Sequence, residues 1–517
     1  GWCDSLLDDL PAGGYDIALA NPPYVRQELL SPDLKYALRK KYPGFSARSD
    51  LYVYFFAMLD RILAPGGVAS VICPTSWMEV GYGSELSDFL ASRFDSVCVI
   101  RSAVERWFEG ACVDAAVVLL VKPGNSCERK PPRRRVRLVT LGSPLDETPW
   151  DALLKELDPD TPPVRASSGT VTVKTIAPAA STGRKWGTSF GDDPLESVFA
   201  PVRERLCRLK EIAAVKRGFT TGANAFFYVR VRRENLDGLV EVESSARPGQ
   251  VAHLPPEVLL PVVRSPREIK GYKVREELLR YRVLAAGAAR FVGAGVALGT
   301  LPGGLDEFIR WGVAHGYHLR PTCAARSPWW ALGRQPIAPI LWPMTVRKRF
   351  FAAMNRAASI DARLYGIYPI EGIDPLLLGA ILNSSVTWLQ AEHACRRYGG
   401  GGGPVDMKVY EVAEFLVPDP RRMAPGARAA MADCFAAMLG RDVLPVDLEV
   451  NLPDRAALDG AVLASLGLDD REAESAGARV REALVQRVEE RTRRAKRVMG
   501  RGPSPRTAGA EGETTLV

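Results

Sequence analysis

The corner Asn21-Pro22-Pro23-Tyr24 combines residue types that could handle an amino group attached to an aromatic ring. Asn21 supplies a side-chain carbonyl, and Pro22 supplies a backbone carbonyl without an N–H of its own. Two such acceptors side by side suit the two hydrogens of an exocyclic –NH2 group. Tyr24 offers a flat face on which a ring can stack. Pro22 and Pro23 stiffen the backbone, so both acceptors are in place before a reaction begins.

Such a pair of acceptors would activate a poor nucleophile. The lone pair of a ring-conjugated amine is delocalised into the ring. Accepting both N–H groups out of the ring plane draws the nitrogen towards tetrahedral geometry and localises its lone pair for attack on an electrophilic methyl group. No strong base is required, because the proton becomes acidic once the nitrogen is alkylated. The plain alternative is a turn that only ends a strand.

The segments around the corner predict an α/β region over residues 1–125. Residues 15–20 have the pattern of a buried strand that ends at the corner, and residues 50–63 that of an amphipathic helix with Asp50 as N-cap. The predicted elements that follow are a strand, a helix and two strands, at residues 68–77, 84–94, 95–102 and 113–122. This order fits the C-terminal half of a doubly wound sheet, in which ligands bind at the carboxyl edge.

Composition indicates a reduced, water-soluble protein. The chain has 517 residues, a net charge of +8 and no C-x-x-C pair among its nine cysteines, which predicts free thiols in a cytoplasmic protein without a structural zinc site. The longest apolar run is too short to span a membrane, and four histidines are few for metal chemistry. The basic charge is a mild indication of a polyanionic partner such as nucleic acid.

The remainder of the chain divides by composition. Residues 126–200 are rich in Arg, Pro, Ser and Gly and predict a linker with one or two short strands. Residues 201–420 predict a mixed α+β region, residues 421–499 a helical region, and residues 500–517 a disordered tail.

The corner and its neighbours resemble a known family. A hydrophobic strand that runs into Asn-Pro-Pro-Tyr is the hallmark of amino-methyltransferases that use S-adenosylmethionine. Residues 3–25, 49–77 and 103–121 resemble the adenine-specific DNA methylases of restriction–modification and phage-exclusion systems. A catalytic segment followed by a recognition domain is the order of the gamma class. The resemblance implies a methyltransferase sheet over residues 1–125 and a target-recognition domain over residues 201–420.

The resemblance also implies roles for individual residues. Asp4 matches the acidic residue that binds the adenine moiety of the cofactor, while Asp50 and Leu51 match residues that line the cofactor side. Phe108 matches the aromatic that packs against the extruded base, with Trp107 as the fallback. For Asp4, a loop or cap role is the alternative; for Asp50, it is the N-cap; for Phe108, it is packing as a core aromatic.

The region over residues 201–420 contains two candidate surfaces for double-stranded DNA. One is a Gly-punctuated turn with Lys216, Arg217, Thr220, Thr221 and Asn224, which suits phosphate and base-edge contacts but equally an ordinary strand–turn–strand. The other is the run of glycines at 399–403, preceded by Arg396 and Arg397, which suits phosphate approach or a flexible connector. For Trp329 and Trp330 we favour packing in the core for at least one.

These features predict a site-specific DNA methyltransferase that flips an adenine out of the duplex, stacks it between Tyr24 and Phe108, and methylates its N6 amino group. Relatives that methylate release-factor glutamine or ribosomal guanine usually end soon after the catalytic domain, whereas this chain continues for much longer. The alternatives are an inactive DNA-binding specificity module and a protein or RNA methyltransferase. A restriction nuclease, upstream or in trans, is the partner that such systems imply.

One departure from the family pattern concerns the cofactor. The glycine-rich loop that cradles the amino-acid part of S-adenosylmethionine in the family is not in this sequence, and we expect it upstream of Gly1. We therefore expect residues 1–517 alone to bind S-adenosylmethionine weakly and to be inactive.

Overall fold

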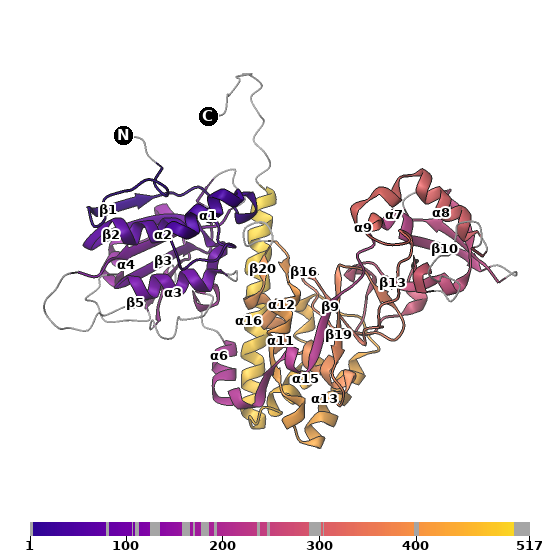
Figure 1. Cartoon of the computed structure of the whole chain (residues 1–517). Helices are drawn as coiled ribbons and strands as arrows, with labels where there is room; N and C mark the ends of the chain where they lie inside the picture. The colour runs from indigo at the N-terminus through magenta and orange to yellow at the C-terminus, as the bar shows by residue number, and fades with distance from the viewer. Residues whose placement is uncertain are drawn as a thin grey trace. The chain divides into compact units, whose positions relative to one another are not determined.

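The computed structural model describes most of the chain (Figure 1). The described ranges are 4–78, 82–105, 107–108, 113–124, 135–157, 166–168, 171–176, 186–190, 194–234, 238–245, 249–288, 301–302, 304–397 and 403–500. The chain forms two compact units. Unit 1 comprises Gly1–Asp193, Arg396–Gly403 and Glu489–Val517, and unit 2 comprises Pro194–Cys395 and Pro404–Val488.

Unit 1 is built on a seven-stranded mixed sheet with the order β1-β2-β4-β3-β5-β7-β6. Strands β1 and β2 are parallel, as are β3 and β5, whereas β4 is antiparallel to both of its neighbours. The strands are β1 (Tyr15–Ala20), β2 (Leu63–Pro74), β3 (Ser96–Ser102), β4 (Ala115–Val121), β5 (Arg135–Leu141), β6 (Ala166–Ser168) and β7 (Val171–Ile176). The α/β prediction for this region is confirmed.

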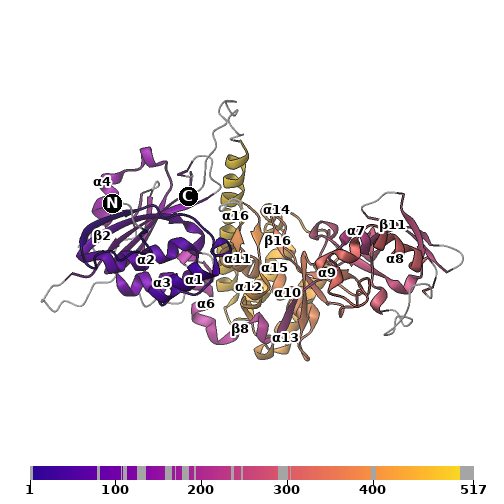
Figure 2. The same cartoon turned by 45° about the horizontal axis from the view of Figure 1, so that its top comes forward.

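Helices cover both faces of this sheet. Figures 1 and 2 show α2 and α3 side by side along one face, where Val97 and Val99 of β3 join their core. Cys98 and Ile100 point to the opposite face and pack with Leu153 of α4. The helices of unit 1 are α1 (Pro32–Lys41), α2 (Leu51–Ile62), α3 (Gly83–Arg93) and α4 (Trp150–Leu157), with 3-10 turns η1 (Gln27–Leu29), η2 (Thr75–Met78), η3 (Leu145–Glu147) and η4 (Trp186–Phe190).

Strand β1 differs from its prediction as a buried strand. It lies at the edge of the sheet, and its side chains Ile17 and Leu19 are 72% and 82% exposed. The alternate residues Ala18 and Ala20 pack against the core of unit 1. The apolar run was therefore correct for a strand but wrong about burial, because alternate side chains point to opposite faces and only one face of β1 is covered.

The region over residues 126–200 also differs from its prediction as a linker. Strands β5, β6 and β7 extend the sheet of unit 1 beyond β3, and β5 pairs with β3 along its whole length. Val136, Leu138 and Leu141 are buried. The apolar segment that forms β5 is short and lies between basic, Pro-rich and Ser/Gly-rich stretches, and its place in the sheet depends on pairing with β3, which is distant in the sequence.

Unit 2 contains two larger sheets. A six-stranded sheet has the order β12-β11-β10-β14-β13-β18, and a four-stranded sheet has the order β17-β15-β19-β9. The remaining strands of unit 2 form two pairs, β22-β8 and β16-β21, whereas β20 belongs to unit 1. The bounds are β8 (Leu206–Arg208), β9 (Ala213–Arg217), β10 (Tyr228–Glu234), β11 (Val240–Ser244), β12 (Val251–Leu254), β13 (Leu259–Val263), β14 (Tyr281–Leu284), β15 (Ile340–Pro343), β16 (Thr345–Val346), β17 (Ala353–Met354), β18 (Ser359–Ile360), β19 (Leu364–Pro369), β20 (Arg396–Arg397), β21 (Val405–Asp406) and β22 (Leu416–Pro418).

The helices of unit 2 pack mainly in its C-terminal half. Helix α13 packs against α10 and α15, and the three contribute to one hydrophobic core with β15 and β19. The longer helices are α8 (Leu305–Ala314), α10 (Pro375–Asn383), α11 (Ser385–Ala394), α13 (Pro425–Met438), α15 (Pro453–Ala464) and α16 (Asp470–Gly500). The short ones are α6 (Pro194–Phe199), α7 (Asn224–Phe227), α9 (Pro321–Ala324), α12 (Val409–Ala413) and α14 (Val446–Glu449). The predicted helical region is thus helical, but it shares its core with the preceding residues.

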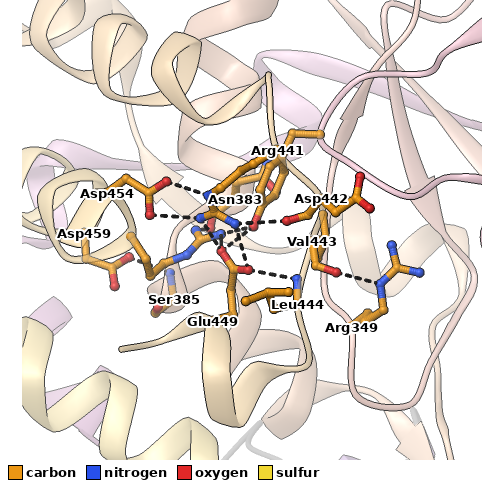
Figure 3. A network of polar contacts seen from close by, with 12 residues as sticks. Arg349, Asn383, Ser385, Arg441, Asp442, Val443, Leu444, Glu449, Asp454 and Asp459 are labelled. Atoms are coloured by element: carbon orange, nitrogen blue, oxygen red, sulfur yellow. Dashed lines mark hydrogen bonds and ion pairs between the residues drawn. The ribbon is translucent and has the colours of Figure 1, made fainter. Parts of the chain in front are cut away.

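A buried ionic network holds the C-terminal half of unit 2 together (Figure 3). The carboxylate of Glu449, which is inaccessible to solvent, accepts hydrogen bonds from Arg441 at 2.7 and 3.0 Å, from Arg455 at 3.1 Å, and from the Tyr272 hydroxyl at 2.7 Å. The Leu444 N–H adds a bond of 3.0 Å. Burial alone would raise the pKa of Glu449, but the hydrogen bond from Arg441 and the charge of Arg455 lower it to about 2.

Within the part of the chain that the structure describes, no helix combines the length and the apolar character needed to cross a membrane. The cysteines described there are free thiols, namely Cys73, Cys98, Cys207, Cys323, Cys395 and Cys434. Over the same residues, no cluster of three or more His, Cys, Asp or Glu side chains could hold a metal ion.

Candidate active site

The predicted corner lies at the carboxyl edge of the sheet of unit 1. Strand β1 ends at Ala20, beside the parallel strand β2, which ends at Pro74. The antiparallel strand β4 begins opposite Pro74, at Ala115. The corner at 21–24 and the segment that enters β4 therefore meet at one edge, where ligands bind in open α/β sheets.

Asn21 and Pro22 differ in their surroundings. Pro22 is buried, whereas the Asn21 side chain is exposed and forms no hydrogen bond with the part of the chain that the structure describes. A side-chain amide that is held on a proline-stiffened turn without an internal partner is available to a ligand.

Tyr24 and Phe108, the two rings predicted to stack on the base, lie next to each other at the corner. Their ring centroids are 6.3 Å apart and their planes meet at 77°, an edge-to-face arrangement. The fallback residue Trp107 packs instead with Val139 and Leu141 in the core on the other face of the sheet. Of the two neighbouring aromatics, the structure therefore brings Phe108 to the corner.

Hydrogen bonds fix the chain around Tyr24. The Tyr24 hydroxyl donates to the carbonyl of Ile72 in β2 at 3.3 Å. Burial, with a smaller effect of the Cys73 thiol, raises the pKa of Tyr24 to about 12, so the phenol stays protonated at neutral pH. One residue later, the carbonyl of Val25 accepts from the N–H of Leu51 at 3.0 Å.

Asp50 occupies the N-cap position of α2, as predicted, but its side chain forms no cap hydrogen bond. Its carboxylate accepts no hydrogen bond from the first turn of α2. Oδ1 instead accepts from the Gln27 N–H at 2.9 Å, and Oδ2 accepts from the Tyr82 hydroxyl at 2.7 Å. Both carboxylate oxygens of Asp50 are thus engaged by groups outside the first turn of α2, so neither is left to cap the helix.

Asp4 forms a local turn and keeps one free oxygen. Its Oδ1 accepts from the N–H groups of Leu6 and Leu7, both at 2.9 Å, and Oδ2 forms no hydrogen bond with the described residues. Asp4 thus keeps a carboxylate oxygen that a cofactor could use, whereas both carboxylate oxygens of Asp50 are engaged. The Leu51 side chain packs partly against the core of unit 1.

The predicted DNA-binding turn of unit 2 joins β9 to α7. Lys216, Arg217, Thr220 and Asn224 are exposed there, and Lys216 lies 5.4 Å from the centre of the Tyr368 ring. The Arg217 guanidinium donates to the carbonyl of Ala362 at 2.9 Å. Thr221, unlike these four residues of the turn, is buried.

Thr221 is 2% exposed, and its hydroxyl donates to the side chain of Asn224 within the turn. Its carbonyl accepts from the Arg326 guanidinium, which also bonds the carbonyl of Thr220 at 3.2 Å. Thr221 therefore supports the turn and its side chain does not face solvent, contrary to the prediction of a DNA contact. A small hydroxyl next to a glycine favours such internal bonding.

Two further predictions from the region over residues 201–420 have different outcomes. Trp330 is buried and Trp329 packs against the same core, so the prediction of a core role for at least one of them is confirmed. Arg396 and Arg397 lie in the short strand β20, but their side chains and the glycines at 399–402 lie outside the described residues.

The sequence analysis missed two groups of polar residues. The first is Tyr82, which bonds to Asp50. Its position in the loop after β2, at the same sheet edge as the corner, is the feature of the sequence that could have indicated a role near the corner. The other is a basic–aromatic cluster in which the Arg264 guanidinium lies 3.9 Å from the Tyr281 ring centre and that of Arg230 lies 5.8 Å from it. These three residues come from around β13, β14 and β10, so only strand pairing brings them together.

Comparisons with known proteins agree with this arrangement. Residues 4–103 match the family model of the Eco57I restriction-modification methylase, and residues 185–434 match that of the C-terminal domain of Type II methyltransferase M.Eco57I. The first match contains the corner and the second contains the turn at 216–224.

Curated relatives are Type II methyltransferases. M.XamI of Xanthomonas campestris pv. amaranthicola is 26% identical over 411 residues, which cover 76% of this chain and 65% of that protein. M.PaeR7I of Pseudomonas aeruginosa is 31% identical over 142 residues, which cover 27% of this chain and 25% of that protein. The chain thus spans less than two thirds of the length of these relatives.

A solved structure has the same fold. The Type IIL restriction-modification enzyme MmeI, determined in complex with DNA, superimposes with a TM-score of 0.50 at 13% identity, over 92% of this chain and 57% of that one. Because these two models, which together match residues 4–103 and 185–434, both describe Eco57I-type methylases, the chain belongs to the Eco57I-type restriction–modification methyltransferases.

Proposed function

We propose that this protein transfers a methyl group from S-adenosylmethionine to the N6 amino group of an adenine flipped out of double-stranded DNA. The observation that carries the proposal is the corner at the carboxyl edge of the sheet, with the exposed amide of Asn21 next to facing rings of Tyr24 and Phe108. Its family membership supports the methyl-transfer chemistry, and the adenine specificity rests on the corner.

The residues of the corner would act in sequence on the flipped base. Tyr24 and Phe108 stack on the ring, which offsets part of the few kcal/mol that unstacking requires, at about 1–3 kcal/mol per stacked base. The carbonyls of Asn21 and Pro22 accept the two amino hydrogens. The nitrogen then forms a bond to the methyl carbon while the carbon–sulfur bond of the donor breaks, and the nitrogen loses one proton.

Residues of this chain that would hold the methyl donor are Asp4, through its free carboxylate oxygen, and Leu51, through apolar contact. S-adenosylmethionine supplies an electrophilic methyl group when bound.

The recognition turn of unit 2 supplies the proposed DNA contacts. Lys216 and Arg217 carry positive charge at its exposed end, and Thr220 and Asn224 present polar groups of the kind that read base edges. Arg396 and Arg397 remain further candidates. The proposed assembly includes a restriction nuclease, as a domain or a separate subunit.

Single-molecule sequencing of DNA from cells that express the complete gene tests the proposed reaction. We expect modified adenines in one short motif, and none in cells that carry an Asn21→Ala gene. Modified cytosines, or labelled methyl groups in RNA or protein but not in DNA, would contradict the proposal. Binding of DNA without any methylation would favour the inactive specificity module instead.

A further inference from the structure

The carboxylate of Asp50 joins two loops at the edge of the sheet that carries the corner. Oδ1 accepts from the backbone N–H of Gln27, three residues after Tyr24, at 2.9 Å. Oδ2 accepts from the hydroxyl of Tyr82, which precedes α3, at 2.7 Å. Within the described part of the chain Asp50 forms no ion pair, so these two hydrogen bonds set the orientation of its carboxylate.

The direction of each hydrogen bond follows from the chemistry of the groups. A carboxylate only accepts, so the Tyr82 hydroxyl donates its hydrogen to Asp50. The Tyr52 hydroxyl, 3.0 Å from that of Tyr82, must then be the donor between the two phenols. Ser76, 3.5 Å from the Tyr52 hydroxyl, is in turn left as the donor to Tyr52. A directed chain thus runs from Ser76 through Tyr52 and Tyr82 to Asp50.

The chain begins and ends on structured parts of the sheet edge. Ser76 belongs to η2, directly after β2, and Tyr52 is 1% exposed in the first turn of α2. Burial is the main cause that raises the pKa of both Tyr52 and Tyr82 well above the ordinary value, so both phenols keep their hydrogens at physiological pH.

We propose that Tyr82 is a positioning residue for the corner at 21–24, which it serves by orienting Asp50 so that Oδ1 holds the N–H of Gln27. This inference rests on the proposed function of the corner as the methyl-transfer site. Together with the bonds Leu51 N–H to Val25 carbonyl and Tyr24 hydroxyl to Ile72 carbonyl, the Asp50 bond fixes the chain directly after the two acceptors.

The expected consequence concerns the rate more than substrate affinity. The carbonyls of Asn21 and Pro22 must lie where the amino hydrogens of the base arrive, and a misplacement of about 1 Å can cost as much as a hundredfold in rate. Unit 2 carries most of the proposed DNA contacts, so a loosened corner should lower kcat while leaving the KM for DNA nearly unchanged.

The test compares Tyr82→Phe with Tyr54→Phe in the complete enzyme. Tyr54 lies in the same helix as Tyr52, packs in the same core as the partly buried Tyr82, and donates to the carbonyl of Ser46 at 3.4 Å, so its variant controls for the loss of a hydrogen-bonded tyrosine hydroxyl from this core. The measurements are amide hydrogen exchange at Gln27, kcat and KM for DNA, and the thermal unfolding midpoint.

For Tyr82→Phe we expect faster exchange at Gln27 and a kcat lower by about tenfold, with a KM for DNA within about twofold of the parent. Tyr54→Phe should leave the exchange at Gln27 and kcat unchanged. An unchanged exchange at Gln27, or a faster exchange without a fall in kcat, would overturn the inference. If the parent enzyme shows no methyl transfer, the proposed function fails, while the exchange comparison still decides whether Tyr82 fixes this segment.

Discussion

The corner at 21–24 and the network around Glu449 use polar groups in opposite ways. Glu449 is inaccessible to solvent, and both of its oxygens accept several hydrogen bonds. Asn21, in contrast, is exposed and leaves its amide unengaged within the described part of the chain. Fully satisfied polar groups hold a fold in one arrangement, whereas polar groups held rigidly without an internal partner are available to a substrate.

The two regions are also held in place by different hydrogen bonds. The network is built from Glu449, Arg455 and Tyr272 in contact with one another. Within the described residues, the acceptors of the corner have no hydrogen-bond donors, but the corner is fixed by bonds of its neighbours, such as Val25 to Leu51 and Gln27 to Asp50. Changes in the network should therefore affect stability, and changes at the corner should affect activity at nearly unchanged stability.

The largest expected effect is on the stability of unit 2. Glu449→Ala removes the carboxylate that neutralises the fully buried guanidinium of Arg455, and leaving a buried charge unpaired costs about 3–5 kcal/mol. The free energy of unfolding from urea titration measures this. The control is Glu414→Ala, which breaks exposed pairs with Arg208 and Lys210 and should cost at most about 1 kcal/mol. Equal losses in the two variants would contradict the assigned role of burial.

The same carboxylate predicts a pH dependence of stability. The pKa of Glu449 is about 2 in the folded protein, below its ordinary value of 4.5. A group with a depressed folded pKa contributes stability that is complete above the ordinary value and is lost as the pH falls towards the folded one. Urea midpoints of the parent should therefore fall between pH 4.5 and about 2, and those of Glu449→Gln should fall less steeply over that window. Parallel pH curves for the two proteins would speak against this carboxylate as the titrating group.

An intermediate effect is expected at the facing rings. Phe108→Ala removes one of the two rings proposed to hold the flipped base, a loss of about 1–3 kcal/mol per stacked base. A duplex with 2-aminopurine at the target position reports the flipped base as a rise in fluorescence. The variant should show a smaller rise at saturating protein, and Phe108→Tyr should retain the parental signal. A parental signal in the alanine variant would remove Phe108 from the site.

The smallest effect is expected at the turn of unit 2. Lys216→Ala or Arg217→Ala should each lower the slope of log affinity against log salt concentration by about 1, if each side chain neutralises one phosphate. Arg310 is a matched exposed control, because its guanidinium is already paired with Asp306 at 2.8 Å. Arg310→Ala should leave the slope unchanged. A slope that is insensitive to Lys216 and Arg217 would place the DNA contacts elsewhere.

Local patterns were sufficient to predict the corner and the order of elements around it. The strand at 15–20, the prolines and the helix at 51–62 are each encoded within a short window, and Phe108, the residue that the family resemblance favoured over Trp107, lies next to Tyr24. Local patterns also predicted the turn between β9 and α7, because glycines and polar residues lie close together there.

What the sequence analysis missed depends on contacts between distant residues. Tyr82 meets Asp50 across 32 positions, and Tyr272 meets Glu449 across 177. Strand β5 joins the sheet of unit 1 through β3, and the exposure of Ile17 depends on which face of β1 is covered. The charge and periodicity of a short sequence segment cannot predict such pairings, because the tertiary arrangement determines them.

The central claim is that the amide of Asn21 accepts an amino hydrogen of the flipped adenine. Its most direct test is the single-turnover rate of methyl transfer by Asn21→Ala in the complete enzyme, with DNA bound at saturation. Removal of one preorganised hydrogen-bonding group should lower this rate by about 10²–10³-fold, with an unchanged free energy of unfolding. A variant that methylates adenine at the parental rate would contradict the account.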